Sequence, residues 1–232
     1  MSSPPAAQRF DVAPVRIASR YQPSSELAGD SHDYNWIDDD HLIVYLLDVS
    51  GHGVAAALLS ISVHNMLRSA SLPDEIMLAP QLLLAELNHH FQMDRHGGNY
   101  FTIWYGVYQV STRTLRYASA GHPPALMFTA GAEPLELNTE GLPVGMFDDT
   151  VFPASSLPVP PGTQILLYSD GAYEWTLPDE RIWSVSEFID MCSRHAHSVD
   201  DWTLDSLMTQ LRTRNAAAGF EDDCSMVLLK FD

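Results

Sequence analysis

The chain has 232 residues, of which 46% are hydrophobic, and this supplies the core of one large globular domain or two small ones. Thirty acidic residues against twelve basic ones give a net charge of −18. This balance excludes nucleic acid and anionic membranes as partners, because both depend on clusters of Lys and Arg. The longest apolar stretch, residues 54–63, is far shorter than the roughly 18 residues of a membrane-spanning helix.

The start of the chain has the composition of a linker. Residues 1–11 contain a Pro-Pro pair and lack the apolar segment of a signal peptide. We therefore expect a linker-like N-terminus over 1–11, which follows another domain in the natural protein, and a single domain over 12–232. The two cysteines, Cys192 and Cys224, form neither a disulfide framework nor a paired zinc motif, so a reducing, cytoplasmic compartment is expected.

Four elements are predicted from the hydrophobic pattern of the first part of the chain. They are strands over residues 12–21 and 41–48 and helices over 54–70 and 79–93. The strand at 41–48 is apolar at almost every position, which is typical of a strand buried on both faces. Small side chains along the helix at 54–70 predict that this helix packs closely against a sheet.

After residue 99, short strands predominate in the pattern. The predicted strands are 100–110, 114–118, 125–128, 151–157, 164–168 and 225–231, and helices at 185–195 and 201–217 precede the last strand. Hairpins are more frequent here than strand–helix–strand alternation, which favours antiparallel pairing. The expected fold is of the α+β class (α/β in the broad sense), with two antiparallel sheets packed face to face and flanked by helices.

The most informative segment is the run of residues 48–53, Asp-Val-Ser-Gly-His-Gly. It places the carboxylate of Asp48 at the exit of an apolar strand, followed by glycines that allow close backbone approach and then by the start of a helix. This arrangement suits a cation or a phosphate group. A single Asp at such a turn is frequently structural, so the segment requires support from elsewhere in the chain.

Three further acidic turns provide that support. Asp30 follows a glycine, with Asp33 three residues later; Asp170 precedes a glycine at the end of a predicted strand; and Asp222 and Asp223 precede the last strand. Any one of these could be an ordinary turn, because Asp-Gly pairs are good turn formers. Hard divalent cations prefer oxygen ligands, and two adjacent cations need several carboxylates to offset their charge. The set of turns therefore favours a divalent metal site.

Six short motifs occur in one order along the chain, from about residue 17 to residue 231. They are residues 21–30 (YQPSSELAGD), 48–53 (DVSGHG), 118–124 (ASAGHPP), 141–145 (GLPVG), 168–171 (YSDG) and 222–225 (DDCS). Together they resemble the PP2C (PPM) type of metal-dependent protein phosphatases, in the bacterial SpoIIE-like branch. The resemblance implies an α-β-β-α sandwich with two Mn²⁺ or Mg²⁺ ions at one end.

By position in these motifs, the resemblance also implies a ligand set. Asp48 would bridge both ions, Asp30 and the carbonyl of Val49 would complete the protein ligands of one ion, and Asp170 and Asp222 those of the other. Asp30, Asp48 and Asp170 are thus the expected catalytic residues. Two cations would lower the pKa of a shared water and position it for in-line attack on phosphorus.

Four residues near these motifs are candidates of lower rank. Asp223 lies next to a ligand position, and Gly51 and Asp33 lie close to others. His52 could donate a proton to the leaving group, although a residue that merely opens the following helix fits the pattern equally well.

The resemblance implies a protein serine/threonine phosphatase in bacterial signalling. Such a domain would be the output of a response regulator in a two-component system, with an N-terminal receiver or sensor domain in the full-length protein. Its expected substrate is a phosphoserine or phosphothreonine protein, such as an anti-sigma-factor antagonist.

Two other functions stay open at this point. The first is an interaction module of the same fold that acts as an adaptor and binds a regulatory partner without catalysis. The second is a zinc hydrolase that uses His89, His90 and His96, which lie close together but lack a fixed ligand spacing and a Cys partner.

Overall fold

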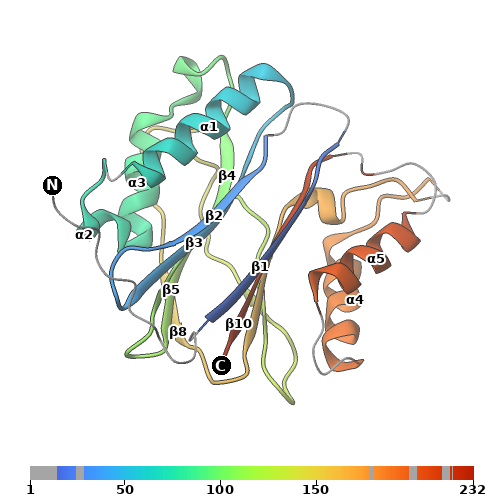
Figure 1. Cartoon of the computed structure of the whole chain (residues 1–232). Helices are drawn as coiled ribbons and strands as arrows, with labels where there is room; N and C mark the ends of the chain where they lie inside the picture. The colour runs from blue at the N-terminus through green and yellow to red at the C-terminus, as the bar shows by residue number, and fades with distance from the viewer. Residues whose placement is uncertain are drawn as a thin grey trace, which may run out of the picture.

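The computed structural model describes residues 15–24, 29–69, 71–177, 180–198, 203–215, 220 and 222–232. These residues form two antiparallel sheets of five strands each, stacked face to face and covered by helices on both outer surfaces (Figure 1). The predicted α-β-β-α sandwich of the α+β class is confirmed. The linker-like segment 1–11 lies outside the described residues.

The two sheets draw their strands from both halves of the chain. The first sheet contains β1 (Val15–Gln22), β6 (Ala125–Phe128), β7 (Leu135–Leu137), β9 (Gln164–Tyr168) and β10 (Cys224–Phe231). The second contains β2 (Ser31–Trp36), β3 (His41–Val49), β4 (Phe101–Gln109), β5 (Thr114–Ala120) and β8 (Ser155–Pro158). The strand order is β1-β10-β9-β6-β7 in the first sheet and β2-β3-β4-β5-β8 in the second.

The helices are divided between the outer faces of the two sheets (Figure 1). The second sheet carries α1 (Val54–Arg68), α2 (Asp74–Met77) and α3 (Pro80–His90), and the first carries α4 (Val185–Ser198) and α5 (Leu204–Arg214). Two single 3-10 turns, η1 (Met93–Arg95) and η2 (Asp170–Ala172), complete the described elements. Within the described residues, no helix combines the length and the apolar character that are needed to cross a bilayer.

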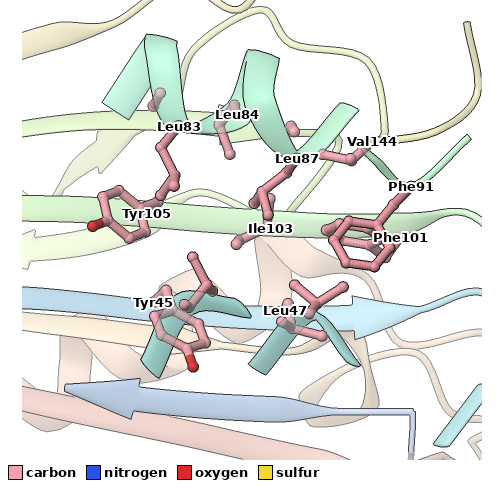
Figure 2. Close-up of a cluster of buried hydrophobic side chains, with 14 of the residues drawn as sticks. Tyr45, Leu47, Leu83, Leu84, Leu87, Phe91, Phe101, Ile103, Tyr105 and Val144 are labelled. Atoms are coloured by element: carbon pink, nitrogen blue, oxygen red, sulfur yellow. The ribbon is translucent and has the colours of Figure 1, made fainter. Parts of the chain in front are cut away.

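Three layers of buried side chains hold the sandwich together. Leu46 and Trp104 face Val227 between the sheets, while Trp183 and Phe188 pack in the layer under α4 and α5. In the layer under α1 and α3, leucines of α3 point onto β4 (Figure 2). The middle strands β3 and β4 contribute to two layers at once, which explains why the sequence of β3 is apolar at nearly every position.

The close packing predicted for the helix at 54–70 is confirmed for α1. The small side chains of Ala56, Ala57 and Ser60 are buried under the helix, whereas Ala55 and Ser62 face outward. Both cysteines are free and buried.

The structure contains two strands that the hydrophobic pattern does not predict, β2 and β7, as well as the short helix α2. Both strands lie at sheet edges and pair on one side only, so they need few apolar side chains. The six residues of β2 include Ser31, Asp33 and Asn35 on one face, which hides the strand from an analysis based on periodicity.

Several predicted boundaries also move, and two of them have a clear local cause. The helix expected over 79–93 ends at His90, because the side-chain amide of Gln92 donates to the Asn88 carbonyl (2.6 Å) and the Met93 N–H donates to the Gly145 carbonyl (2.9 Å). The strand expected over 151–157 begins only at Ser155, after a proline that has no N–H to donate to a sheet.

Candidate functional site

Antiparallel pairing brings the four acidic turns to the same end of the sandwich. Ser31, at the start of β2, pairs with Leu47 near the end of β3, so Asp30 lies beside Asp48. In the other sheet, the end of β9 pairs with the start of β10, which brings Asp170 and Asp222 together. The two sheets therefore each contribute two carboxylates at this end.

A cavity of about 410 Å³ lies between these strand ends. Three of the four carboxylates line it, those of Asp48, Asp170 and Asp222. The other lining residues are Ser24, Val49, Ser50, Gly51, His52, Tyr100 and Thr102. The cavity wall is thus built from both sheets and from the turn that precedes α1.

The turn after β3 is held in place by the neighbouring strand. The Ser50 N–H donates to the Tyr100 carbonyl (2.9 Å), and the Tyr100 N–H donates to Ser50 Oγ (3.0 Å). Gly51 and Gly53 adopt φ values of 81° and 86°, a left-handed conformation that a side chain would strain. These constraints direct the chain from Asp48 into α1 along the cavity wall.

The carboxylates at this end raise one another's pKa values. Burial, followed by the charges of Asp30, Asp170 and Asp222, raises the pKa of Asp48 to about 9. Burial also raises the pKa of Asp30 to about 7 and that of Asp170 to about 6, and in both cases neighbouring carboxylates add to the effect. Such a cluster of negative charge is unfavourable unless protons or cations offset it.

The residues present fit a divalent cation. Asp30 Oδ2 is buried without a hydrogen-bond partner among the described residues. A Cβ atom on Gly29 would lie 2.8 Å from the Val49 carbonyl oxygen, so a glycine is needed for this segment to lie against the end of β3. The available donors are carboxylate and carbonyl oxygens, which Mg²⁺ and Mn²⁺ prefer.

The histidines of the zinc hypothesis, His89, His90 and His96, contact neighbouring side chains. His90 Nε2 lies 3.0 Å from Glu86 Oε1, and the ring of His96 lies against Phe91. These imidazoles thus contact other side chains of their own region.

The candidates of lower rank lie in different places. Gly51 and His52 line the cavity, as the sequence pattern predicts for residues of this turn. Asp33 faces α1 instead, where its Oδ2 lies 3.1 Å from Arg68 Nε. Asp223 is buried, and its carboxylate accepts hydrogen bonds from the backbone N–H groups of Ser24 and Gly29.

Sequence reasoning misses several residues that line the cavity. Thr102 pairs with Asp48 across β3 and β4, Tyr100 anchors the turn at Ser50, and Ser24 approaches from the segment after β1. Tyr100 and Thr102 lie outside the six short motifs, and Ser24 lies inside the motif at residues 21–30 but is not one of its acidic residues. Only the register of the sheet places Thr102 beside Asp48, and that register cannot be read from the sequence of β4 alone.

Comparison with known proteins agrees with this architecture. The profile of the family described as Stage II sporulation protein E (SpoIIE) matches residues 38–232. Phosphoserine phosphatase RsbP of Bacillus subtilis is 31% identical over 219 residues, which cover 93% of this chain and 52% of RsbP. Phosphoserine phosphatase RsbU of the same organism is 27% identical over 174 residues, 73% of this chain and 48% of RsbU. The chain thus spans about half the length of these two relatives.

Among solved structures, the SiaA-PP2C domain of Pseudomonas aeruginosa superposes with a TM-score of 0.78 at 19% identity. The superposition covers 93% of this chain and 86% of that domain, so the likeness includes both sheets and the helices on their outer faces. Together with the family match and the antiparallel sandwich, it shows that the chain is a member of the SpoIIE family and has the fold of PP2C phosphatase domains.

Proposed function

We propose that this chain is a metal-dependent serine/threonine protein phosphatase that hydrolyses phosphomonoesters with a metal-activated water. The proposal rests on one observation: Asp48, Asp170 and Asp222 converge on one cavity from the ends of both sheets, and Asp30 lies beside Asp48. The printed names of RsbP and RsbU, both phosphoserine phosphatases, support the same activity.

The proposed ligands are those that the motif positions imply. Asp48 would help to hold both ions, with Asp30 and the Val49 carbonyl as further ligands of one and Asp170 and Asp222 as further ligands of the other. When bound, a pair of Mn²⁺ or Mg²⁺ ions supplies a water of lowered pKa and offsets the charge of the phosphoryl oxygens.

The remaining cavity residues bind and orient the substrate in this proposal. The hydroxyl groups of Ser50 and Thr102 lie in the wall of the cavity, where they can donate to phosphate oxygens. His52 lies in the same wall and can hold the proton that the serine alkoxide needs when it leaves. The carboxylates repel a free phosphate dianion until cations are present, which makes substrate binding depend on metal.

The test is release of phosphate from p-nitrophenyl phosphate and from a serine-phosphorylated protein, with Mn²⁺, with Mg²⁺ and after removal of metal with EDTA. We expect turnover with added Mn²⁺ or Mg²⁺ and none after EDTA. Full activity in a metal-free preparation would contradict the two-metal mechanism. Binding of the phosphoprotein without any release, at all metal concentrations, would favour the adaptor function instead.

The cellular context of the proposal is regulatory. We propose that residues 12–232 form one cytoplasmic phosphatase domain after the linker-like segment 1–11, behind a receiver or sensor domain of a two-component system. The greater length of RsbP and RsbU supports additional domains. The proposed substrate is a phosphoserine or phosphothreonine anti-sigma-factor antagonist.

The substrate proposal is tested with a panel of phosphoproteins. Serine-phosphorylated anti-sigma antagonists from the same cell are offered to the purified domain beside unrelated phosphopeptides of equal charge. A marked preference for one antagonist is expected, because a net charge of −18 provides no general attraction to acidic phosphoproteins. Equal rates on all substrates would argue against a dedicated partner.

A further inference from the structure

Asp223 is a buried carboxylate next to the cavity, with only 5% of its surface exposed. Its two oxygens accept hydrogen bonds from backbone N–H groups at the two ends of one segment. The Ser24 N–H donates to Oδ1 (2.8 Å), and the Gly29 N–H donates to Oδ2 (3.2 Å). The hydroxyl of Tyr21 lies 3.4 Å from Oδ1 as a third, weaker donor.

The main chain of Asp223 is also held by hydrogen bonds to Asp222 and to Ser169, which follows β9. Its N–H donates to Asp222 Oδ1 (2.7 Å), and its carbonyl accepts a hydrogen bond from Ser169 Oγ (3.1 Å). Ser169 immediately precedes Asp170. Asp223 therefore contacts Gly29 and Ser169, which precede Asp30 and Asp170, and it also contacts the carboxylate of Asp222. Asp222, and not Asp223, lines the cavity.

From these contacts, we propose that Asp223 is a positioning residue: it fastens the backbone at Ser24 and Gly29 to the start of β10, and so sets the position of Asp30 and of the cavity rim. This inference rests on the proposed function of the site, which it deepens. It reassigns Asp223 from a candidate metal ligand to the anchor of a neighbouring segment.

The packing of Gly29 explains why this anchor matters. A Cβ at Gly29 would meet the Val49 carbonyl oxygen at 2.8 Å and Asp48 Oδ1 at 3.5 Å. The residue is thus clamped between the end of β3 and the carboxylate of Asp223. A shift of Gly29 would move Asp30, the next residue, relative to Asp48.

Substitutions at Asp223 separate anchoring from metal ligation. In Asp223→Asn, one oxygen remains to accept from one N–H, but the amide NH₂ must face the other N–H, so one of the two anchors is lost. In Asp223→Ala both are lost. Asp222→Asn is the matched control, because it removes the adjacent carboxylate that lines the cavity and leaves the Asp223 side chain in place.

The experiment is amide hydrogen exchange at Ser24 and Gly29 in metal-free protein, measured by NMR, so its outcome does not depend on phosphatase activity. We expect exchange to be faster by about tenfold or more at both amides in Asp223→Ala and at one of them in Asp223→Asn, because hydrogen bonds to a buried carboxyl group are lost. Asp222→Asn and Tyr21→Phe should leave exchange at Gly29 close to that of the unmodified protein.

A second measurement uses the thermal stabilisation produced by Mn²⁺ alone. Asp223→Asn should raise the Mn²⁺ concentration that gives half of the full stabilisation, yet reach that stabilisation at saturation, because the ligands are displaced but present. If Asp223→Asn abolishes the response to Mn²⁺ while exchange at Ser24 and Gly29 is unchanged, Asp223 is a ligand and the anchor assignment is wrong. If Asp223→Asn changes neither the exchange at Ser24 and Gly29 nor the Mn²⁺ dependence of the stability, the anchor assignment is also wrong.

Discussion

At the scale of single residues, the carboxyl group of Asp48 is the one in the site whose pKa is raised furthest. Its pKa is raised to about 9, first by burial and then by the charges of Asp30, which immediately precedes β2, and of Asp170 and Asp222 in the other sheet. Without metal, this cluster of carboxylates destabilises the native state, and only bound cations or protons offset the effect.

The substitution Asp48→Asn should abolish metal-dependent turnover and stabilise the metal-free protein. It removes the proposed bridging ligand and also a carboxyl group whose burial among other carboxylates costs free energy in the metal-free fold, which favours folding on the order of 1 kcal/mol, or roughly 2–4 °C in melting temperature for a domain of this size. Phosphate release with Mn²⁺ and thermal melts in EDTA measure the two effects. Asp33→Asn is the control, since Asp33 pairs with Arg68 outside the cavity. A near-normal rate in Asp48→Asn would refute the ligand assignment.

The stability of the metal-free protein should fall as pH rises from about 4 to about 9. The native pKa values of Asp170, Asp30 and Asp48, about 6, 7 and 9, all lie above the ordinary aspartate value of 3.8. The native state therefore binds protons more tightly than the unfolded state, and its stability decreases as these protons are lost. Urea unfolding in EDTA at several pH values gives the slope, and added Mn²⁺ should flatten it. A free energy of unfolding that increased with pH over this range would contradict the electrostatic description of the site.

At the scale of elements, α3 is joined to the loop at 145–148 by the side chain of Asn88. This side chain is 2% exposed, donates to the carbonyls of Phe147 (2.9 Å) and Asp148 (3.1 Å), and accepts from the Gly145 N–H (2.7 Å). Because α3 also packs on β4, these hydrogen bonds hold the end of the helix and the loop on the same sheet.

Asn88→Ala should destabilise the protein by about 3 kcal/mol, because it leaves buried backbone groups without partners and opens a small cavity. Urea unfolding at fixed pH and metal concentration measures the loss. Asn65→Ala is the matched control, since Asn65 is exposed on α1 and its side chain should contribute little. Equal losses in the two variants would show that the Asn88 hydrogen bonds do not stabilise the loop.

At the scale of the whole molecule, the cavity lies where the two sheets meet, and each sheet provides part of its wall. Asp48 belongs to the sheet covered by α1 to α3, whereas Asp170 and Asp222 lie at strand ends of the sheet covered by α4 and α5. A metal centre held by carboxylates of both sheets would link the two halves of the sandwich.

Saturating Mn²⁺ should therefore raise the melting temperature of the entire domain in one cooperative transition. Binding to the native state alone adds about 2.7 kcal/mol at a free metal concentration of roughly 100 times Kd. Calorimetry with and without Mn²⁺ measures the shift. Both Asp48→Asn and Asp170→Asn should reduce it, although they lie in different sheets, and Asp33→Asn should not. A shift that survives both ligand substitutions would place the bound metal elsewhere.

The sequence alone was sufficient to predict the class of the fold and the position of the acidic turns. Local features carry this information: the apolar run of β3 requires burial on both faces, and the Asp-Val-Ser-Gly-His-Gly turn requires glycines with positive φ. The hairpin between β4 and β5 was predictable for the same reason, because the residues of a turn are adjacent in the sequence.

Only the tertiary structure decided which residues surround those turns. Thr102 reaches the cavity through the register of β4 against β3, and β2 is a strand because an edge position pairs it with β3 despite its polar sequence. The adjacent carboxylates of Asp222 and Asp223 look equivalent in the sequence, yet one lines the cavity and the other is buried against backbone N–H groups. Both residues lie in the irregular segment before β10, and which of them faces the cavity is set by contacts with Ser24, Gly29 and Ser169, which are far away in the chain.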